Sequence, residues 1–208
     1  MPGRSSVHEA LETRSAILRT AADIASVEGL DGVSIGRLAA ELRMSKSGVI
    51  GHFGSKEELQ LATLALATRI FRERVWEPAE HLTPGLPRLL GICEAWTRYT
   101  DNPGYPGGCF IAQVSYEYDS REGRVHDELA RTMGLWRSTL MAEIDIAVET
   151  GDLPADTDAA QVAFSLNALA SGMNPARHLH GDTDTASWTL RAMRAVLRLP
   201  PLDPAPAT

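Results

Sequence analysis

SIGRLAAELRMSKSGVIGHFGSK, residues 34–56, is the stretch that decides the fold. It predicts two short helices at a corner, one from Ser34 to about Leu42 and one from Ser45 to about His52. A serine hydroxyl at a helix start accepts a hydrogen bond from a first-turn amide that has no partner within the helix. Apolar residues recur at helical spacing on both pieces and can meet across the corner. The pattern indicates a helix-turn-helix.

The outer face of the second helix separates this corner from an ordinary helical corner. Its residues are small, polar or basic except for one isoleucine, and they are Lys46, Ser47, Gly48, Ile50, Gly51 and His52. Such a face suits a DNA groove, although a solvated helix face is the alternative interpretation. The local charge favours DNA, because residues 34–56 contain four basic side chains and one acidic one, or +3, in a chain of net charge -7.

The pattern S-K-S-G-x-x-x-H-F-x-S-K-E-E-L, from Ser45 to Leu59, closely resembles the DNA-binding segment of the TetR family of bacterial transcriptional regulators. The motif resemblance extends back to about Thr13, and beyond Leu59 only length and helix order agree. Two positions depart from the family pattern. Ile50 replaces an aromatic residue in the recognition helix, and Arg43 replaces a glycine in the turn, where a left-handed or bridge conformation is expected.

The resemblance and the side-chain chemistry together predict the DNA contacts. Lys46 and Ser47 are expected near base edges, and Ile50 can touch a thymine methyl group. Lys56 is expected at a phosphate, in the first turn of the next helix, where amides and the helix dipole already favour an anion. Ser34 and His52 are also expected at phosphates. The full set of expected DNA-binding residues is Ser34, Arg37, Ser45, Lys46, Ser47, Gly48, Ile50, Gly51, His52 and Lys56.

Length, composition and cysteine content limit the class of protein. The 208 residues suit a small module joined to a larger domain, and 44% hydrophobic residues allow a sizeable core. No run of 18 apolar residues occurs and the N-terminus lacks the apolar centre of a signal peptide, so we expect a soluble cytoplasmic protein with no membrane partner. Cys93 and Cys109 are too few for a disulfide framework or thiolate metal site, and neither a metal nor a cofactor is expected.

Helical periodicity continues along the chain without a strand pattern or internal repeat, so we predict an all-α fold with about nine helices. After a polar segment of about ten residues, the later helices are expected at about 13–28, 55–75, 86–100, 109–118, 122–150, 158–178 and 185–199. The predicted domains are a helix-turn-helix DNA-binding domain at 1–55, a helical regulatory domain at 56–200 and a disordered proline-rich tail at 201–208. The helix at 55–75 is expected to be the only continuous link between the two domains.

Nine residues on four predicted helices of the second domain suggest a small-molecule site. Core packing is the alternative for most of them individually. Gln113 and Asn167 fall among apolar neighbours, and an apolar cavity with a few polar groups is typical of a ligand pocket. The family resemblance also implies such a pocket. The expected ligand-binding residues are Trp96, Tyr99, Phe110, Gln113, Tyr116, Met133, Trp136, Phe164 and Asn167.

The last two predicted helices are apolar on more than one side, whereas a surface helix of a monomer carries a single apolar stripe. On the last helix, one stripe includes Met193 and Leu197, and the other needs a second partner. We therefore expect a homodimer through a four-helix bundle, which would present two recognition helices to successive major grooves of a palindromic site. The expected interface residues are Ala163, Ala170, Trp188, Ala192, Ala195 and Leu199.

The expected function is a ligand-responsive repressor that binds a palindromic double-stranded operator as a homodimer and is released by a small-molecule effector of unknown identity. The alternative is an all-α small-molecule-binding or enzymatic protein whose helix-turn-helix is only structural. An enzyme would use Cys109 as nucleophile and a histidine as base, and no nucleophile elbow, phosphate loop or zinc-protease motif occurs, so no catalytic residue is expected. The acidic remainder of the chain disfavours a nonspecific architectural DNA binder.

Overall fold

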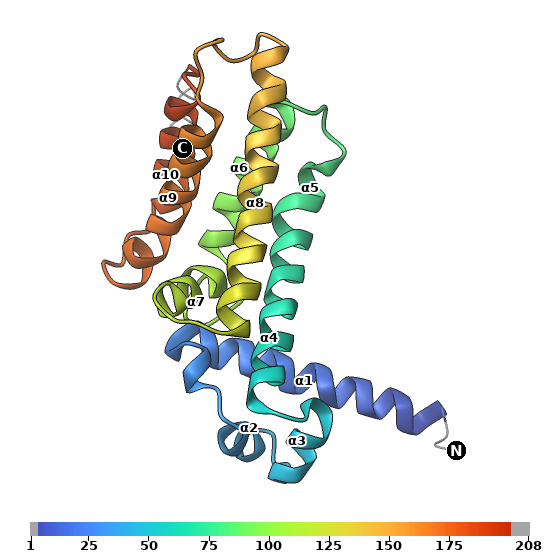
Figure 1. The fold of residues 1–208 in the computed structure, drawn as a ribbon. Coiled ribbons are helices and arrows are strands. Elements are labelled where there is room, and N and C mark those ends of the chain that lie inside the picture. The colour runs from blue at the N-terminus through green and yellow to red at the C-terminus, as the bar shows by residue number, and fades with distance from the viewer. Residues whose placement is uncertain (1–3, 201–208) are drawn as a thin grey trace. The chain divides into compact units, whose positions relative to one another are not determined.

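The computed structural model describes residues 4–200, and the tail predicted at 201–208 lies outside them. The elements (Figure 1) are α1 Arg4–Glu28, the short 3-10 helix η1 Leu30–Gly32, α2 Ile35–Glu41, α3 Lys46–Phe53, α4 Lys56–Phe71, the π-helical segment η2 Arg72–Trp76, α5 Glu77–Glu80, α6 Leu86–Asp101, α7 Phe110–Tyr118, α8 Arg124–Glu149, α9 Ala159–His178 and α10 Thr185–Val196. Because α4, η2 and α5 continue into one another, residues 4–200 form nine helical rods and no strand. The all-α prediction is confirmed.

Three serines begin the helices of the N-terminal region. The backbone amide three residues further on donates to each hydroxyl oxygen, at 3.2 Å for Ser34, 3.0 Å for Ser45 and 3.1 Å for Ser55. These bonds confirm the caps predicted at Ser34 and Ser45 and add one at Ser55, and each is worth about 1 kcal/mol of helix stability. The starts of α2, α3 and α4 are therefore fixed by local sequence.

The first helix begins earlier than the sequence predicted. It starts at Arg4, whereas the pattern placed its start near Thr13 and left the preceding residues outside the helix. Glu, Ala and Leu in this part of the chain are strong helix formers, so they continue the helix although Val7 and Leu11 stay exposed. The helix ends as predicted at Gly29, whose φ of 77° suits glycine.

The described chain forms two compact units. The first contains the chain up to Ile70 together with Gly104–Arg131, and the second contains Phe71–Pro103 together with the chain from Thr132 onward. This division differs from the domain boundary predicted after residue 55, because the first unit also includes α7 and the beginning of α8. The chain crosses between the units three times, so the expectation of a single continuous link was wrong.

The core of the first unit joins α1 to the helix-turn-helix. Ile17, Leu38 and Val49 are fully buried, and so are Leu30 and Val33. Figure 1 shows α2 and α3 meeting at the corner beside α1. The three N-terminal helices therefore share one small apolar centre.

The loop before α7 lies directly against the end of α1. Gly107 donates its backbone N–H to Ser26 Oγ at 3.0 Å, and a Cβ atom at Gly107 would lie 2.0 Å from the Ser26 carbonyl oxygen. A side chain there would force the two backbones apart, so this contact requires glycine. The run of prolines and glycines at 101–108 thus serves packing of the first unit as well as ending α6.

The second unit contains α6, most of α8, and α9 and α10, which lie side by side (Figure 1). A buried ion pair fixes α6 to α8: Arg88 donates to Glu143 at 3.0 Å, and the other oxygen of Glu143 accepts from Gly85 N at 2.7 Å. Glu143 is buried. One carboxylate therefore satisfies both a guanidinium and the amide that precedes α6.

Glu143→Ala should lower the free energy of unfolding of the second unit by about 3 kcal/mol, because removal of one partner leaves the other charge buried and unpaired. Urea denaturation followed by tryptophan fluorescence measures this unit, since Trp76, Trp96, Trp136 and Trp188 all belong to it. Asp156→Ala is the matched control, because Asp156 pairs with Arg198 on the surface of the same unit. Equal destabilisation by the two variants would contradict the importance of the buried pair.

Candidate nucleic-acid interface

The short helix α3 has one buried side and one exposed side. Val49 and Phe53 point into the core of the first unit, and the Arg14 guanidinium lies 4.9 Å from the centre of the Phe53 ring. Ile50 is 43% exposed. The exposed side consists of Lys46, Ser47, Ile50 and Gly51. Four of the six residues predicted on the outward face of this helix are therefore exposed, whereas Gly48 and His52 are half-buried.

Small residues leave part of the exposed side of α3 without projecting side chains. A Cβ atom at Gly51 would meet open space, so its absence leaves the helix surface accessible at that point. The Lys46 side chain passes close to α2, because a Cβ atom at Gly36 would lie 3.4 Å from Lys46 Cε. At 1.5 Å per residue the eight residues of α3 extend about 12 Å, which is comparable to the width of the DNA major groove.

The turn between α2 and α3 contains a strained residue. Arg43 has a φ of 53°, in the left-handed region, as the missing glycine led us to expect. The bonds at this turn have the pattern of a Schellman helix end, because Met44 N donates to the carbonyl of Ala39 at 2.8 Å and Arg43 N donates to that of Ala40 at 3.3 Å. The corner closes with arginine at a position that usually favours glycine.

Arg37 is paired with acids of its own unit. Its NH1 group donates to Glu28 Oε2 at 2.5 Å, and its Nε donates to Glu41 Oε1 at 2.9 Å. The hydrogen bond to Glu28, followed by that to Glu41, raises the pKa of Arg37. The positive charge around α3 therefore rests on Arg43, Lys46 and Lys56, whereas the predicted contact of Arg37 with DNA requires release from two carboxylates.

The three residues predicted at phosphates all belong to this unit. Ser34 is exposed, and its hydroxyl oxygen already accepts the cap bond of α2, which leaves the hydroxyl hydrogen for another partner. His52 is half-buried in the last turn of α3. Lys56 is half-exposed, and its ammonium group donates to the carbonyl of Asp31 at 3.1 Å.

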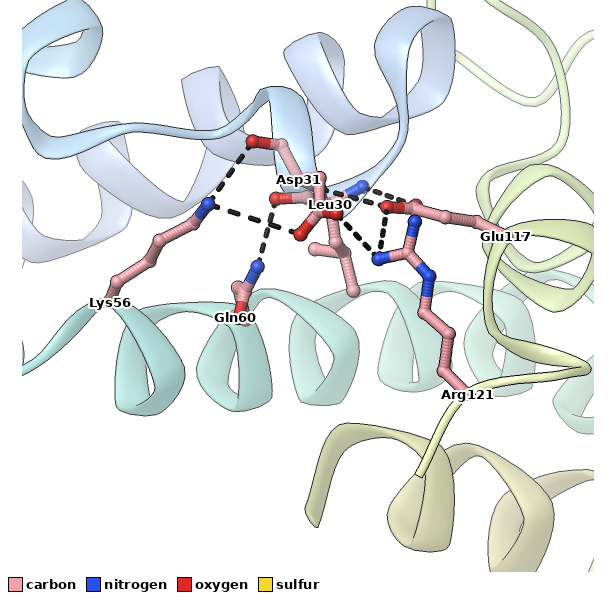
Figure 2. A network of polar contacts seen from close by, with 6 residues as sticks. All are labelled: Leu30, Asp31, Lys56, Gln60, Glu117 and Arg121. Atoms are coloured by element: carbon pink, nitrogen blue, oxygen red, sulfur yellow. Dashed lines mark hydrogen bonds and ion pairs between the residues drawn. The ribbon is translucent and has the colours of Figure 1, made fainter. Parts of the chain in front are cut away.

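A polar network that the sequence did not reveal surrounds η1 (Figure 2). The carboxylate of Glu117, on α7, accepts from Leu30 N at 2.6 Å and from Asp31 N at 3.0 Å, and Gln60 Nε2 donates to the Leu30 carbonyl at 3.0 Å. Arg121 NH1 lies 2.5 Å from Asp31 Oδ2. The one available signal was the single acid of α7, Glu117, in an otherwise uncharged helix, and no sequence pattern names its partners.

Three of the predicted ligand residues lie in the second unit around a phenylalanine that we did not predict. The ring centre of Phe71 lies 5.9 Å from that of Trp96, 5.4 Å from that of Tyr99 and 5.0 Å from that of Trp136, each in an edge-to-face arrangement. Met133 is half-buried one helical turn before Trp136 on α8. Phe71 was overlooked because the sequence placed it within a linking helix.

The structure does not bring the other predicted ligand residues to this cluster. Phe110, Gln113 and Tyr116 belong to α7 in the first unit, and Tyr116 is 65% exposed. Phe164, on α9, is 66% exposed, so its side chain lies on the surface and not in a cavity. Asn167 is half-buried on the same helix. Helical periodicity places residues on one face but does not say whether another helix covers that face.

Some of the predicted dimer residues are accessible on the second unit and others are buried within it. Trp188 and Ala195 are exposed on α10, and Ala192 and Leu199 are half-buried, whereas Met193 and Leu197 form the buried stripe. The two-stripe prediction for this helix therefore agrees with the structure. Ala163 and Ala170 require correction, because other helices of the second unit cover them and leave them almost no surface for a partner.

A cavity of about 230 Å³ lies in the second unit, where the start of α9 meets the end of α10. Its lining includes Leu153, Asp158, Gln161 and Leu197 and none of the predicted ligand residues. It is smaller than typical ligand pockets of about 300–1,000 Å³. This cavity therefore does not correspond to the predicted ligand pocket.

The described residues contain neither a metal-binding cluster nor a membrane-spanning helix, and both cysteines are buried. Within residues 4–200, no group of three or more His, Cys, Asp or Glu side chains is arranged to hold a metal ion. Cys93 and Cys109 are buried and form no disulfide bond, and burial raises the pKa of Cys93 to about 12. None of the helices between residues 4 and 200 combines the length and apolar character needed to cross a membrane.

Comparison with protein families agrees with this geometry. The model described as "Bacterial regulatory proteins, tetR family" matches residues 17–63, and the model described as "Tetracyclin repressor-like, C-terminal domain" matches residues 85–193, more than half of the chain. The chain belongs to the TetR family. TetR-family proteins are transcriptional regulators with a DNA-binding and a ligand-binding domain, they are generally not enzymes, and repression from a palindromic operator by a dimer is typical of them.

Solved TetR structures share the fold at low sequence identity. A TetR transcriptional regulator from Chloroflexus aurantiacus J-10-FL is 21% identical, with a TM-score of 0.83 over 92% of this chain and 96% of that one. A TetR-family regulator from Streptomyces coelicolor is 24% identical, with a TM-score of 0.75 over 90% and 95%. AibR, solved with isovaleryl coenzyme A and operator DNA, is 23% identical, with a TM-score of 0.69 over 91% and 99%. No curated protein sequence matches the chain.

Proposed function

We propose that this TetR-family protein is a cytoplasmic repressor that binds a palindromic operator as a homodimer and leaves it when a small-molecule effector binds. The observation that carries the proposal is the exposed polar side of α3 beside the serine-capped first turn of α4, which bears Lys56. A groove-sized helix can reach base edges, and a capped helix start with a lysine can hold a phosphate. The proposal includes no catalytic activity.

The DNA-facing residues have different tasks in this proposal. Lys46 and Ser47 begin α3 and meet base edges, and Ile50 packs on a thymine methyl group. Ser34, His52 and Lys56 contact phosphates and set the orientation of the unit on the duplex. Ser45 supports the arrangement, because its hydroxyl holds the start of α3 and lies 3.1 Å from that of Ser47.

Lys56→Ala should weaken binding to operator and random duplexes by about the same factor, because a phosphate contact carries no base information. Removal of this one phosphate contact should also reduce the slope of log affinity against log salt by about one unit. Ile50→Ala should instead change the preferred bases. Fluorescence anisotropy with labelled DNA from upstream of the coding sequence and with random DNA measures both effects. Unchanged affinity and salt slope in Lys56→Ala would contradict this placement of DNA.

The proposed dimer interface is the outer side of α9 and α10. Phe164 and Trp188 are large apolar side chains exposed on α9 and α10. These two helices lie side by side (Figure 1). Ala168 and Ala195 are exposed small residues, and a Cβ atom at Gly172 would meet open space, so another helix can approach closely. Burial of this surface against a second copy would form a four-helix bundle about a two-fold axis.

Ala195→Arg should give a monomer with nearly unchanged helix content, because Ala195 is exposed in the single chain and arginine would be unpaired and buried only in the dimer. The monomer should also lose operator binding, since one recognition helix contacts too few bases. Sedimentation velocity and circular dichroism measure the two properties. Ala142→Arg, the same change at an exposed position of α8 in the same unit, should stay dimeric. A dimeric Ala195→Arg would place the interface elsewhere.

The proposed effector site is the aromatic cluster around Phe71 in the second unit. Trp136 Nε1 is buried there without a hydrogen-bond partner among the described residues. A buried donor left unpaired costs about 1–3 kcal/mol, so a ligand atom that accepts from Trp136 would recover part of that cost. We therefore infer an uncharged, largely apolar effector with at least one hydrogen-bond acceptor. AibR provides a precedent, since it was solved with both a small molecule and operator DNA.

The chain itself connects this cluster to the DNA-facing surface. Phe71 ends α4, whose first turn carries Lys56, and the π-helical segment η2 follows immediately. Such π-helical turns occur frequently at functional sites. An effector that reorients Phe71 would act on the helix that presents Lys56, and linkage requires it to bind more weakly to the operator-bound protein than to the free protein.

Trp136→Phe should raise the effector concentration needed for DNA release about tenfold, because the ring stays apolar and only the N–H donor is removed. Effectors can be found by screening uncharged apolar compounds for release of labelled upstream DNA. Trp76→Phe is the matched control, since Trp76 packs under Arg88 outside the cluster. A Trp136→Phe variant released at the wild-type concentration would show that Trp136 does not bind the effector.

A further inference from the structure

A row of alternating charges connects α7 to the first turn of α4 within the first unit (Figure 2). Arg121 NH1 lies 3.4 Å from Glu117 Oε1 and 2.5 Å from Asp31 Oδ2, and Asp31 Oδ1 lies 4.0 Å from Lys56 Nζ. Two acids and two bases alternate, so the row carries no net charge. The ammonium group at its end is the one proposed to hold a DNA phosphate.

Asp31 competes with DNA for Lys56. The lysine donates to the Asp31 carbonyl at 3.1 Å, and the Asp31 carboxylate is the acid paired with it. Lys56 remains about half-exposed, so a phosphate can also reach it. A carboxylate beside a phosphate-binding lysine has two effects, since it weakens the net positive potential and repels the phosphate itself.

Arg121 offsets the Asp31 charge. Its guanidinium bonds to the Asp31 oxygen other than the one nearest Lys56, and it lies 4.8 Å from the centre of the Tyr118 ring, which helps to hold it in place. Glu117, the other acid near Arg121, uses its carboxylate to accept from the amides of Leu30 and Asp31. The two cations of this network that lie near Asp31 are Lys56 and Arg121. Because Arg121 neutralises Asp31, the Lys56 ammonium group stays available to a phosphate.

We propose that Arg121 is a positioning residue for DNA binding: it neutralises Asp31 and so keeps Lys56 available to a phosphate. This inference rests on the proposed role of Lys56 in DNA binding. It assigns part of the DNA affinity to a residue that follows α7, far in sequence from the helix-turn-helix. Without Arg121, the network would carry a net negative charge next to the phosphate site.

The test is a set of charge substitutions measured by anisotropy, at several salt concentrations, with a labelled random-sequence duplex and a duplex from upstream of the coding sequence. Arg121→Gln should weaken binding to both about fivefold at low salt, the upper range for one exposed charge pair. Asp31→Asn combined with Arg121→Gln should bind within about twofold of Asp31→Asn alone. In a Lys56→Ala background, Arg121→Gln should have less than about a twofold effect.

Two further variants separate charge from structure. Arg121→Lys keeps the positive charge and should retain most of the DNA affinity. If the shape of the arginine side chain mattered instead of its charge, this variant would lose affinity as Arg121→Gln does. Arg131→Gln removes the same charge from an exposed site of the same unit, where the arginine pairs with Glu128, and should bind DNA nearly as wild type does. Circular dichroism of each variant verifies the fold.

Several results would overturn the inference. Unchanged binding by Arg121→Gln would do so. A loss of affinity that persists in the Asp31→Asn or Lys56→Ala background would also do so, because Arg121 would then act on DNA directly or through the fold. A wild-type protein without salt-dependent binding to either duplex would remove the proposed function and this inference together. A wild type that binds, with an Arg121→Gln that binds equally well, would remove the inference alone.

Discussion

The arrangement of the first unit depends on one carboxylate. Glu117 accepts from two successive amides of η1, and a Cβ atom at Gly29 would lie 2.3 Å from its Oε2 atom. Glycine is thus needed at that turn both for its positive φ and for the space that Glu117 occupies. The three N-terminal helices alone are a small module with a limited core. Bonds from α7 and from the loop before it add the support that their own apolar centre cannot supply.

Features set by neighbours in sequence could be predicted, and features set by distant partners could not. The serine caps, the end of α1 at Gly29 and the left-handed Arg43 each depend on a few adjacent residues, and the structure agrees with all three. Ser55 and Glu58 have the spacing of a capping box, and the structure forms only half of one: Glu58 N donates to the serine hydroxyl, but the Glu58 carboxylate bonds to Arg124 of α8. Contacts such as Gly107 with Ser26 have no sequence signature, because nothing near either residue specifies the other.

Prediction of the candidate sites was limited in the same way by contacts between distant parts of the chain. Periodicity identified the exposed side of α3 and the two stripes of α10, since one helix alone determines which residues share a face. It could not say which face a neighbouring helix covers, so Ala163 was assigned to a surface that is buried and Phe164 to a cavity that it does not enter. Phe71 was missed because its importance comes from three aromatic side chains on α6 and α8. Helix contacts, not helix patterns, decide these positions.

Recognition of DNA through α3 by a symmetric dimer is the central claim for this TetR-family chain. Hydroxyl-radical footprinting of the purified protein on DNA from upstream of its own coding sequence tests the claim most directly. We expect a protected palindrome whose two half-sites lie about 34 Å apart, one helical turn, on the same side of the duplex. Uniform protection along the whole fragment, or no protection at concentrations where the protein is dimeric, would contradict it.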